Sequence, residues 1–306
     1  MHQIYLTFTI DTEPDSSGDS WNYREPLSFR GVEEGIGKIL VPLFEKYGAR
    51  PTYMVNNVVM NDEKSVMILH SLENCELGAH LHPEFIEPER WFENPGGHGG
   101  KCNLCFLSQD VEEQKIRNIT ALFKEKFGYA PRSFRAGRWS ARGNTVRVLS
   151  ELGYLADTTV TSGIRWRDPS RVQAVDYRFA PRQPYHPSAK NLCWKGSLPL
   201  WEIPVSVCGY FPFKRKWLRP AEYLTPDLVQ AAKEFIRQNI YRRKIFLNCM
   251  FHDIDFMTDL GPHCKDVEKQ TFFLSELERL LRFAQETGIQ MKTLSEMAEI
   301  CGGGMP

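Results

Sequence analysis

Short apolar runs alternate with helical patterns along this 306-residue chain, and this alternation constrains the fold more than any other feature. Residues 4–10 are rich in β-branched and aromatic side chains, which is typical of a buried strand. Apolar residues from Ile36 to Phe44 then fall on one helical face, and Gly48 is the expected stop. A second short strand is expected at residues 52–55. The succession predicts a β-α-β unit.

The same alternation continues to the end of the chain. We expect strands at residues 75–80, 133–136, 154–157, 200–205, 244–251 and 290–293, and helices at residues 111–127, 145–152, 228–236, 272–287 and just beyond. This pattern favours a parallel α/β arrangement, either a barrel or a doubly wound sheet, with residues 1–306 as a single domain. Residues 83–108 and 161–198 do not fit the alternation, and long loops of this kind are more often walls of a site than accidents.

The charge balance excludes some classes of partner. Basic and acidic residues number 38 each, so no global basic field is available to hold nucleic acid or an anionic membrane. No apolar stretch reaches the roughly 18 residues that a membrane span needs. The N-terminal sequence MHQIYLTFTIDTE lacks the basic and apolar regions of a signal peptide, so we expect a soluble, cytoplasmic protein.

Charged and histidine side chains stand at the expected C-terminal ends of five strands. These residues are Asp11, Glu13, His80, His82, Arg135, Asp157 and His252. In parallel α/β folds the C-terminal strand ends converge on one face, where ligands bind. A lone histidine pair is more often structural, but the coincidence of several such groups at corresponding strand ends favours a common site.

The spacing of these groups predicts a metal centre. His80 and His82 are two residues apart, so on an extended chain they point to the same side. Two imidazoles and one carboxylate, with positions left for water, are typical of a catalytic zinc or a comparable divalent site. A second carboxylate can take a proton from water, and a further histidine can protonate a leaving nitrogen. Asp11 and His252 are available for these two roles.

Together these residues resemble the motifs of the polysaccharide deacetylases with NodB homology, carbohydrate esterase family four and its relatives, and most closely the WbmS-like branch. The corresponding segments, in chain order, are FTIDTEPD, ELGAHLHPE, SFRAGRWS, LWEIPVS and NCMFHDID, followed by MKTLSEM. The resemblance therefore covers nearly the whole chain. It implies a distorted (β/α)7 barrel that removes acetyl from an N-acetylated sugar with the help of a divalent metal, expected to be Zn²⁺.

The resemblance also implies a role for each residue. Asp11 would be the catalytic base and His252 the catalytic acid. Arg135 would pair with Asp11, orient it and lower its pKa through its nearby positive charge. His80 and His82 would bind the metal together with a carboxylate.

The chain departs from the best-known pattern of this family in three places. The first motif is Asp-Thr-Glu rather than two adjacent aspartates, so Glu13 is the expected metal carboxylate and Asp11 the alternative. The second motif places its histidines two residues apart rather than four. The third has Gly137-Arg138 where Pro-Tyr is common, which adds a cation to the site wall and hints at an acidic sugar or a phosphate. A backbone N–H near Arg138 would help to bind the tetrahedral oxyanion.

Substrate contacts are expected from Arg138, Trp139 and Asp157. Asp157 is placed at the rim of the site, with a helix or turn cap as the alternative. Further indoles could stack on sugar rings, with ordinary core packing as the alternative: Trp91, Trp166, Trp194 and Trp201. For Trp201, which lies in an apolar strand, we favour core packing. Glu202 is expected to have a structural role, buried against an arginine.

A Cys-x-x-Cys pair lies in the long segment before residue 108. His98, Cys102 and Cys105 are three candidate metal ligands, but structural zinc normally needs four. We therefore favour a flexible loop over the site, with a metal clip as the alternative.

The expected function is deacetylation of a nucleotide-linked sugar, a lipid-linked sugar or an oligosaccharide in surface polysaccharide biosynthesis. One alternative is hydrolysis of another C–N bond, such as a formyl group or a cyclic amide. The other is a catalytically silent sugar-binding protein, which the presence of both Asp11 and His252 disfavours.

Overall fold

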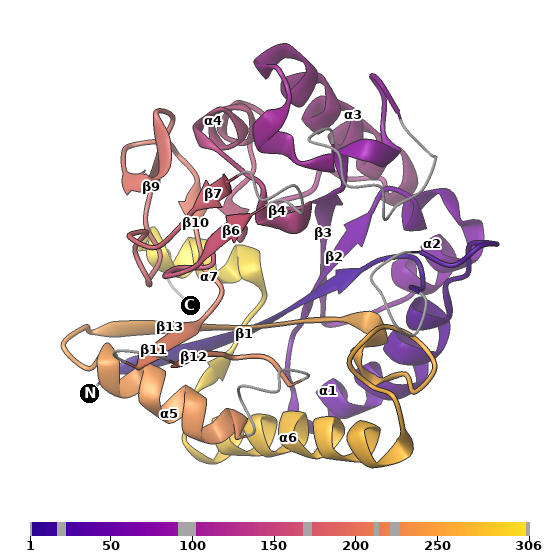
Figure 1. Ribbon diagram of the computed structural model, residues 1–306. Helices are drawn as coiled ribbons and strands as arrows, with labels where there is room; N and C mark the ends of the chain where they lie inside the picture. Colours follow the sequence, from indigo (N-terminus) through magenta and orange to yellow (C-terminus); the bar gives the residue numbers. More distant parts are fainter. Residues whose placement is uncertain are drawn as a thin grey trace.

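A parallel sheet that curls into part of a barrel forms the centre of the protein (Figure 1). The computed structural model describes residues 2–16, 23–90, 102–167, 173–210, 214–220 and 227–303. The strands follow the order β10-β5-β4-β3-β2-β1-β13, and β14 pairs with the first half of β1. Their bounds are β1 Gln3–Thr12, β2 Thr52–Asn56, β3 Glu76–Leu81, β4 Ser133–Ala136, β5 Ala156–Asp157, β10 Trp201–Glu202, β13 Lys244–His252 and β14 Gln290–Met291.

Helices pack on the outside of this sheet. They are η1 Gly31–Leu40, α1 Val41–Tyr47, α2 Glu63–His70, α3 Gln109–Phe127, α4 Gly143–Glu151, α5 Leu228–Gln238, α6 Val267–Glu286 and α7 Leu294–Cys301. The sequence sets their limits locally, and α3 is an example. Ser108 caps its first turn by accepting a hydrogen bond from the Val111 N–H, and Gly128 ends it in the left-handed conformation. Among the described helices, none is both long and apolar enough to cross a membrane.

The longest strand pairing is that of β1 with β13, and it defines the two ends of the sheet. The register runs from Gln3 opposite Lys244 to Asp11 opposite His252. Both strands are buried along almost their whole length, which explains why each reads as a continuous apolar run. Because all pairings in this sheet are parallel, its C-terminal strand ends lie at one edge.

The structure confirms the parallel α/β arrangement and corrects several details. The strand expected at residues 200–205 is only two residues long, because Pro204 has no N–H for a ladder hydrogen bond. Residues 161–198 are not simply a loop. They contain two antiparallel hairpins that the sequence did not predict, and a third follows: β6 Arg165–Arg167 with β7 Gln173–Asp176, β8 Pro187–Ser188 with β9 Asn191–Lys195, and β11 Val207–Tyr210 with β12 Lys214–Trp217.

The segment that follows β10 reaches the outer edge of β13. The Ser206 N–H donates to the Asn248 carbonyl at 3.0 Å, the Leu218 N–H donates to the Ser206 carbonyl at 2.9 Å, and the Met250 N–H donates to the Leu218 carbonyl at 3.2 Å. These bonds supply partners for some backbone groups at the edge of β13. They also place Arg219, the residue after Leu218, near the C-terminal end of that strand.

Candidate active site

The six residues expected to form the catalytic centre meet at the C-terminal edge of the sheet. Asp11 lies opposite His252 in the β1–β13 pairing, and His80 lies opposite Arg135 in the β3–β4 pairing. Glu13 and His82 each follow directly after the end of their strand. The sheet topology therefore brings together residues that are up to 241 positions apart in the chain.

Glu13, His80 and His82 form a compact group of metal-ligand type. The Glu13 Oε1 atom lies 2.7 Å from Nε2 of His80 and 3.0 Å from Nε2 of His82. All three side chains are buried. The second carboxylate oxygen of Glu13 accepts a hydrogen bond from the Tyr23 hydroxyl at 3.1 Å, which fixes the orientation of the carboxylate.

The hydrogen bonding of His80 fits a bound cation. Its Nδ1 atom lies 3.1 Å from the backbone carbonyl oxygen of Arg135, and because a carbonyl only accepts, this nitrogen carries the hydrogen. In the neutral ring, Nε2 then presents its lone pair to the Glu13 carboxylate. Two lone pairs at this separation repel unless a proton or a metal ion lies between them. A histidine held through its other nitrogen by a carbonyl is the usual arrangement for a metal ligand.

His82 lies between two carboxylates. Burial disfavours its charged form, but the negative charges of Glu13 and Glu84 outweigh burial and raise the pKa of His82 to about 9. Glu84 is buried too, and the positive charge of Arg138 outweighs its burial and lowers the pKa of Glu84 to about 2. Without a metal, the negative charge of these carboxylates therefore favours a proton on His82. A bound divalent cation would neutralise the same charge.

Asp11 is an ionised carboxylate beside this group. Burial alone would raise its pKa, but Arg135 above all, helped by His80 and His252, lowers the pKa of Asp11 below its usual value. The Nη1 atom of Arg135 donates to Asp11 Oδ1 at 2.6 Å. Arg135 is fully buried and also donates to the Thr9 hydroxyl at 2.6 Å, so its position is fixed by the sheet itself.

His252 faces the other oxygen of Asp11. Its Nε2 atom lies 3.9 Å from Asp11 Oδ2. On its other side, Arg219 donates to Nδ1 of His252 at 3.0 Å and to Asp255 at 2.9 Å. Because arginine only donates, a neutral His252 ring carries its proton on Nε2, the nitrogen that faces Asp11. Asp11, Glu13 and His252 also lie close enough to form a second candidate ligand group, so the geometry leaves open which carboxylate holds a metal.

Arg138 lies beside the site, but its charge is already paired. Its Nη2 atom is 2.5 Å from Glu84 Oε1, and Nη1 donates to the Cys102 carbonyl at 3.0 Å. The idea that this cation faces an acidic group on the substrate is therefore not supported, because Glu84 neutralises it. A direct contact of Arg138 with substrate stays a prediction.

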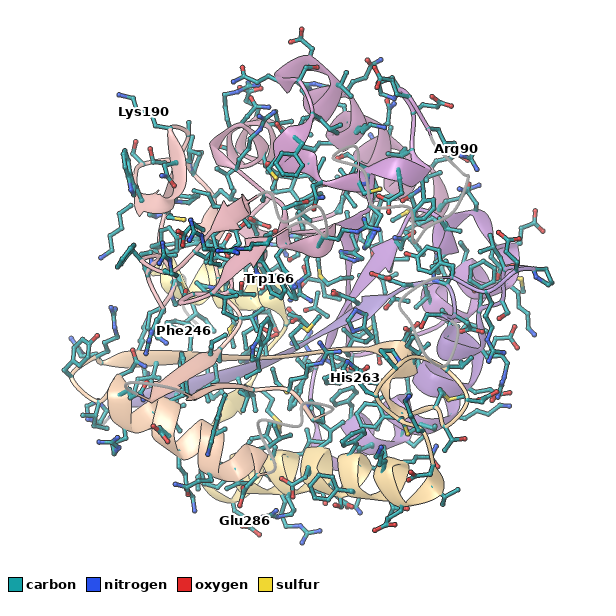
Figure 2. All side chains as sticks on the ribbon, in the orientation of Figure 1. Arg90, Trp166, Lys190, Phe246, His263 and Glu286 are labelled. Atoms are coloured by element: carbon teal, nitrogen blue, oxygen red, sulfur yellow. The ribbon has the colours of Figure 1, made fainter. Side chains whose placement is uncertain are left out.

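Three partly buried indoles gather next to Arg135. The Trp139 ring lies 6.1 Å from the Trp166 ring and 5.8 Å from the Trp217 ring, measured between centroids. The Arg135 guanidinium lies 5.3 Å from the Trp139 centroid. Trp166, which donates to the Thr161 hydroxyl at 2.8 Å, is labelled near the centre of Figure 2. We call Trp139, Trp166 and Trp217 the indole cluster.

The placement of Asp157 at the rim of the site is wrong. Its side chain has no exposed surface, accepts a hydrogen bond from the Thr159 hydroxyl at 2.6 Å and lies against Glu202. Burial raises the pKa of both carboxyl groups, and the Asp157 charge raises that of Glu202 further. The two carboxyls therefore form a buried pair near Arg135 in which burial disfavours the charged form of each. Glu202 is buried, but its close partner is the acid Asp157.

The cysteine pair forms no metal cluster within the described residues. The eight cysteines are thiols rather than disulfides, and neither candidate ligand group in the described part of the chain contains a cysteine. Cys102 is buried. His98 and Trp91 lie outside the described residues. Of the other indoles, Trp194 is 60% exposed, far more than a core residue.

Sequence patterns missed four residues that complete the site: Tyr23, Glu84, Arg219 and Asp255. Glu84 had a usable signal, because it follows His80 and His82 at the same two-residue spacing. Tyr23 and Arg219 come from irregular segments, and no periodic pattern points to them.

No protein-family model and no curated protein sequence matches this chain. Solved structures do. A candidate polysaccharide deacetylase from Mycobacterium smegmatis superimposes with a TM-score of 0.51 at 14% identity, over 99% of this chain and 93% of that one. The chain has the fold of the polysaccharide deacetylases.

The polysaccharide deacetylase fold is shared by proteins of other activities. The PuuE allantoinase gives a TM-score of 0.56 at 12% identity, over 99% of this chain and 92% of that one. A GH57-type branching enzyme from Pyrococcus horikoshii gives 0.55 at 12% identity, over 97% of this chain and 70% of that one. The fold alone therefore does not select a reaction, and the residues of the site must do so.

Proposed function

We propose that the protein is a metal-dependent hydrolase that removes the N-acetyl group from an amino sugar. The observation that carries this proposal is the position of the Glu13–His80–His82 group beside the facing pair Asp11 and His252. Amide hydrolysis needs an activated water, a base and an acid for the leaving nitrogen. Each of these requirements has a candidate side chain within this one edge of the sheet.

Glu13, His80 and His82 would hold the metal, expected to be Zn²⁺, with Asp11 as the alternative carboxylate. When bound, such an ion lowers the pKa of a water to about 7 and polarises the amide carbonyl. The lone pair of His80 Nε2 and the Glu13 carboxylate suit this ligand role.

Asp11 would act as the base through Oδ2, the oxygen that does not accept from Arg135. Arg135 keeps this carboxylate ionised and prevents it from rotating. His252 would act as the acid with its ring protonated on both nitrogens: the Nε2–H faces the site, and the Asp255 carboxylate lies 3.8 Å from Nδ1. The two groups lie 3.9 Å apart at the same edge of the sheet, so Asp11 could take a proton from the attacking water and His252 could give one to the leaving nitrogen.

The backbone after β4 is suited to bind the oxyanion. Arg138 and Trp139 both have positive φ angles, 52° and 57°, which is rare for such residues and turns the chain sharply at the site. Gly137 permits this bend, because a Cβ atom there would lie 2.5 Å from the His82 ring. We propose that an N–H of this bend donates to the developing oxyanion.

The indole cluster supports a sugar as substrate. Aromatic faces bind the apolar C–H faces of sugars, and these three rings are partly exposed beside Arg135. The substrate class would be a nucleotide-linked sugar, a lipid-linked sugar or an oligosaccharide in surface polysaccharide biosynthesis. Hydrolysis of another C–N bond, such as that of a formyl or cyclic amide, is the second candidate, because the fold match to an allantoinase is as good as that to a deacetylase.

One experiment distinguishes these functions. The purified protein, loaded with Zn²⁺, is incubated with N-acetyl sugars in nucleotide-linked, lipid-linked and oligosaccharide form, and with allantoin and an N-formyl sugar. Released acetate, formate or ring-opened product is measured. Acetate release that disappears in Asp11→Asn and survives in the exposed variant Lys190→Ala supports the deacetylase. Ring opening or formate release without acetate release selects the second candidate, and binding without any turnover selects a silent sugar-binding protein.

A further inference from the structure

A cavity of about 600 Å³ lies at the opposite end of the sheet from the candidate active site. Its wall includes Gln3 and Lys244, the first pair in the β1–β13 register, whereas Asp11 and His252 are the last. Eight residue steps along β1 separate Gln3 from Asp11, which corresponds to about 26 Å in an extended strand. The cavity is therefore separate from the catalytic residues and needs its own explanation.

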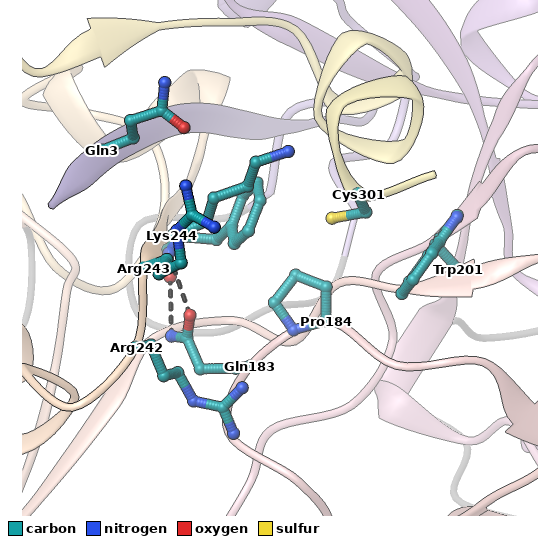
Figure 3. Close-up of a pocket in the computed structure, with 9 residues that line it drawn as sticks. Gln3, Gln183, Pro184, Trp201, Arg242, Arg243, Lys244 and Cys301 are labelled. Atoms are coloured by element: carbon teal, nitrogen blue, oxygen red, sulfur yellow. Dashed lines mark hydrogen bonds between the residues drawn. The ribbon is translucent and has the colours of Figure 1, made fainter. Parts of the chain in front are cut away.

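One side of the cavity is basic. Three consecutive residues before and at the start of β13 line it: Arg242, Arg243 and Lys244 (Figure 3). Within the described part of the chain, no acidic residue lines the cavity and neither arginine forms a salt bridge. The Nε atom of Arg242 is buried without a hydrogen-bond partner. Lys244 is partly satisfied, because its Nζ donates to the Ile300 carbonyl at 2.8 Å.

The opposite side of the cavity is aromatic and apolar. Figure 3 shows Trp201 across the cavity from the arginines, with Pro184 between them. The Trp201 ring packs on His186 with centroids 3.9 Å apart, which holds the indole in place. The Arg242 guanidinium lies 5.4 Å from the centroid of the Tyr241 ring, but neither arginine has an acidic partner among the described residues. A flat wall opposite two such guanidinium groups suits a ligand that has both a negative charge and a flat ring.

The floor of the cavity is rigid. The Gln183 side chain binds both backbone groups of Phe246: its Nε2 donates to the carbonyl at 3.0 Å, and its Oε1 accepts from the N–H at 2.9 Å (Figure 3). Phe246 itself stacks on Tyr5 at 5.2 Å. The cavity is thus formed in advance, as ligand sites usually are, and its volume falls within the range of roughly 300–1,000 Å³ that such sites occupy.

We propose that this cavity binds a phosphorylated small molecule that carries a flat ring, such as a nucleoside phosphate. The phosphate would sit against Arg242 and Arg243, whose guanidinium groups match phosphate geometry and whose mutual repulsion an anion would relieve. The ring would lie against Trp201. This site is independent of the proposed catalytic function.

Calorimetry on the full-length protein tests this proposal with three probes: ADP, adenosine and inorganic phosphate. We expect ADP to bind, and the double variant Arg242→Ser/Arg243→Ser to bind it roughly tenfold or more weakly. The variant Trp201→Leu should weaken ADP binding but leave phosphate binding unchanged. The matched control Lys190→Ser/Lys195→Ser removes two exposed positive charges elsewhere and should bind ADP as the unchanged protein does.

Three results would overturn the proposal. The first is no ADP binding by a correctly folded protein. The second is ADP binding that Asp11→Asn abolishes and the double arginine variant retains, which would place the ligand in the candidate active site. The third is equal binding of ADP and inorganic phosphate with no effect of Trp201→Leu, which would leave only a general anion site. Circular dichroism and thermal unfolding confirm that each variant folds.

Discussion

Arg135 donates to Asp11 across 2.6 Å, with the arginine fully buried and the aspartate almost so. Removing the arginine would leave a buried carboxylate without its main counter-charge. We expect Arg135→Met to lower the free energy of unfolding by about 3–5 kcal/mol at neutral pH. Urea unfolding measures this loss.

The same variant has a signature in the pH dependence of activity. Arg135 lowers the pKa of Asp11, so in Arg135→Met this pKa should rise, and the acidic limb of the kcat/KM profile should move to higher pH. An unchanged acidic limb in a folded variant would mean that Asp11 is not the base. Arg132→Met is a matched control, because that arginine is exposed and pairs with Glu299 at the surface.

Gly137→Ala should weaken metal binding more than it weakens the fold. The new Cβ atom would lie 2.5 Å from the His82 ring, so the ring must move away from Glu13. We expect zinc affinity to fall roughly tenfold or more, as for other disturbed ligand shells. Competition with a zinc chelator measures the affinity. Gly37→Ala serves as a comparison, because a Cβ atom there comes no closer than 3.7 Å to a neighbouring atom, and neither Gly37 nor Gly137 has a positive φ angle. Equal zinc affinity in both variants would argue against His82 as a ligand.

Glu202→Gln should change how stability depends on pH. Burial and Asp157 raise the pKa of Glu202 in the folded state, so above the unfolded value of about 4.3 the native state binds more protons than the unfolded state. The free energy of unfolding therefore falls as pH rises from about 4 towards the raised pKa. Glutamine keeps a hydrogen bond to Asp157 without this titration. We expect the variant to lose less stability than the unchanged protein between about pH 4 and pH 8. Parallel pH profiles from urea unfolding would show that Glu202 does not titrate in this range.

Trp217→Leu tests the indole cluster as a substrate wall. Trp217 packs against Trp139 and Trp166, and leucine keeps an apolar side chain there while removing the flat face. We expect KM for an active sugar substrate to rise about five- to tenfold while kcat changes little, since stacking of this kind is worth about 1–1.5 kcal/mol. Steady-state kinetics separates the two constants. A fall in kcat at constant KM would instead indicate a role in chemistry.

The sequence predicted the barrel strands and the main catalytic candidates because both leave local patterns. β1 and β13 are continuous apolar runs, and His80 and His82 share a face through their two-residue spacing. Such signals need no knowledge of the rest of the chain.

The remaining features depend on contacts between distant residues. Asp157 was placed at the rim because its burial against Glu202, 45 positions later, cannot be read from either residue alone. Arg219 gave no signal because backbone hydrogen bonds to β13 carry it to His252. The ion pair of Arg138 was not predicted for the same reason, since Glu84 lies 54 positions earlier in the chain.

Trp217 and Arg219 lie two positions apart on the segment that hydrogen bonds to the edge of β13. The first belongs to the indole cluster and the second holds His252. A displacement of this short segment would move a ring of the indole cluster and the arginine that contacts His252 at the same time. If the proposed roles hold, an insertion near residue 218 should change substrate selectivity and proton delivery together.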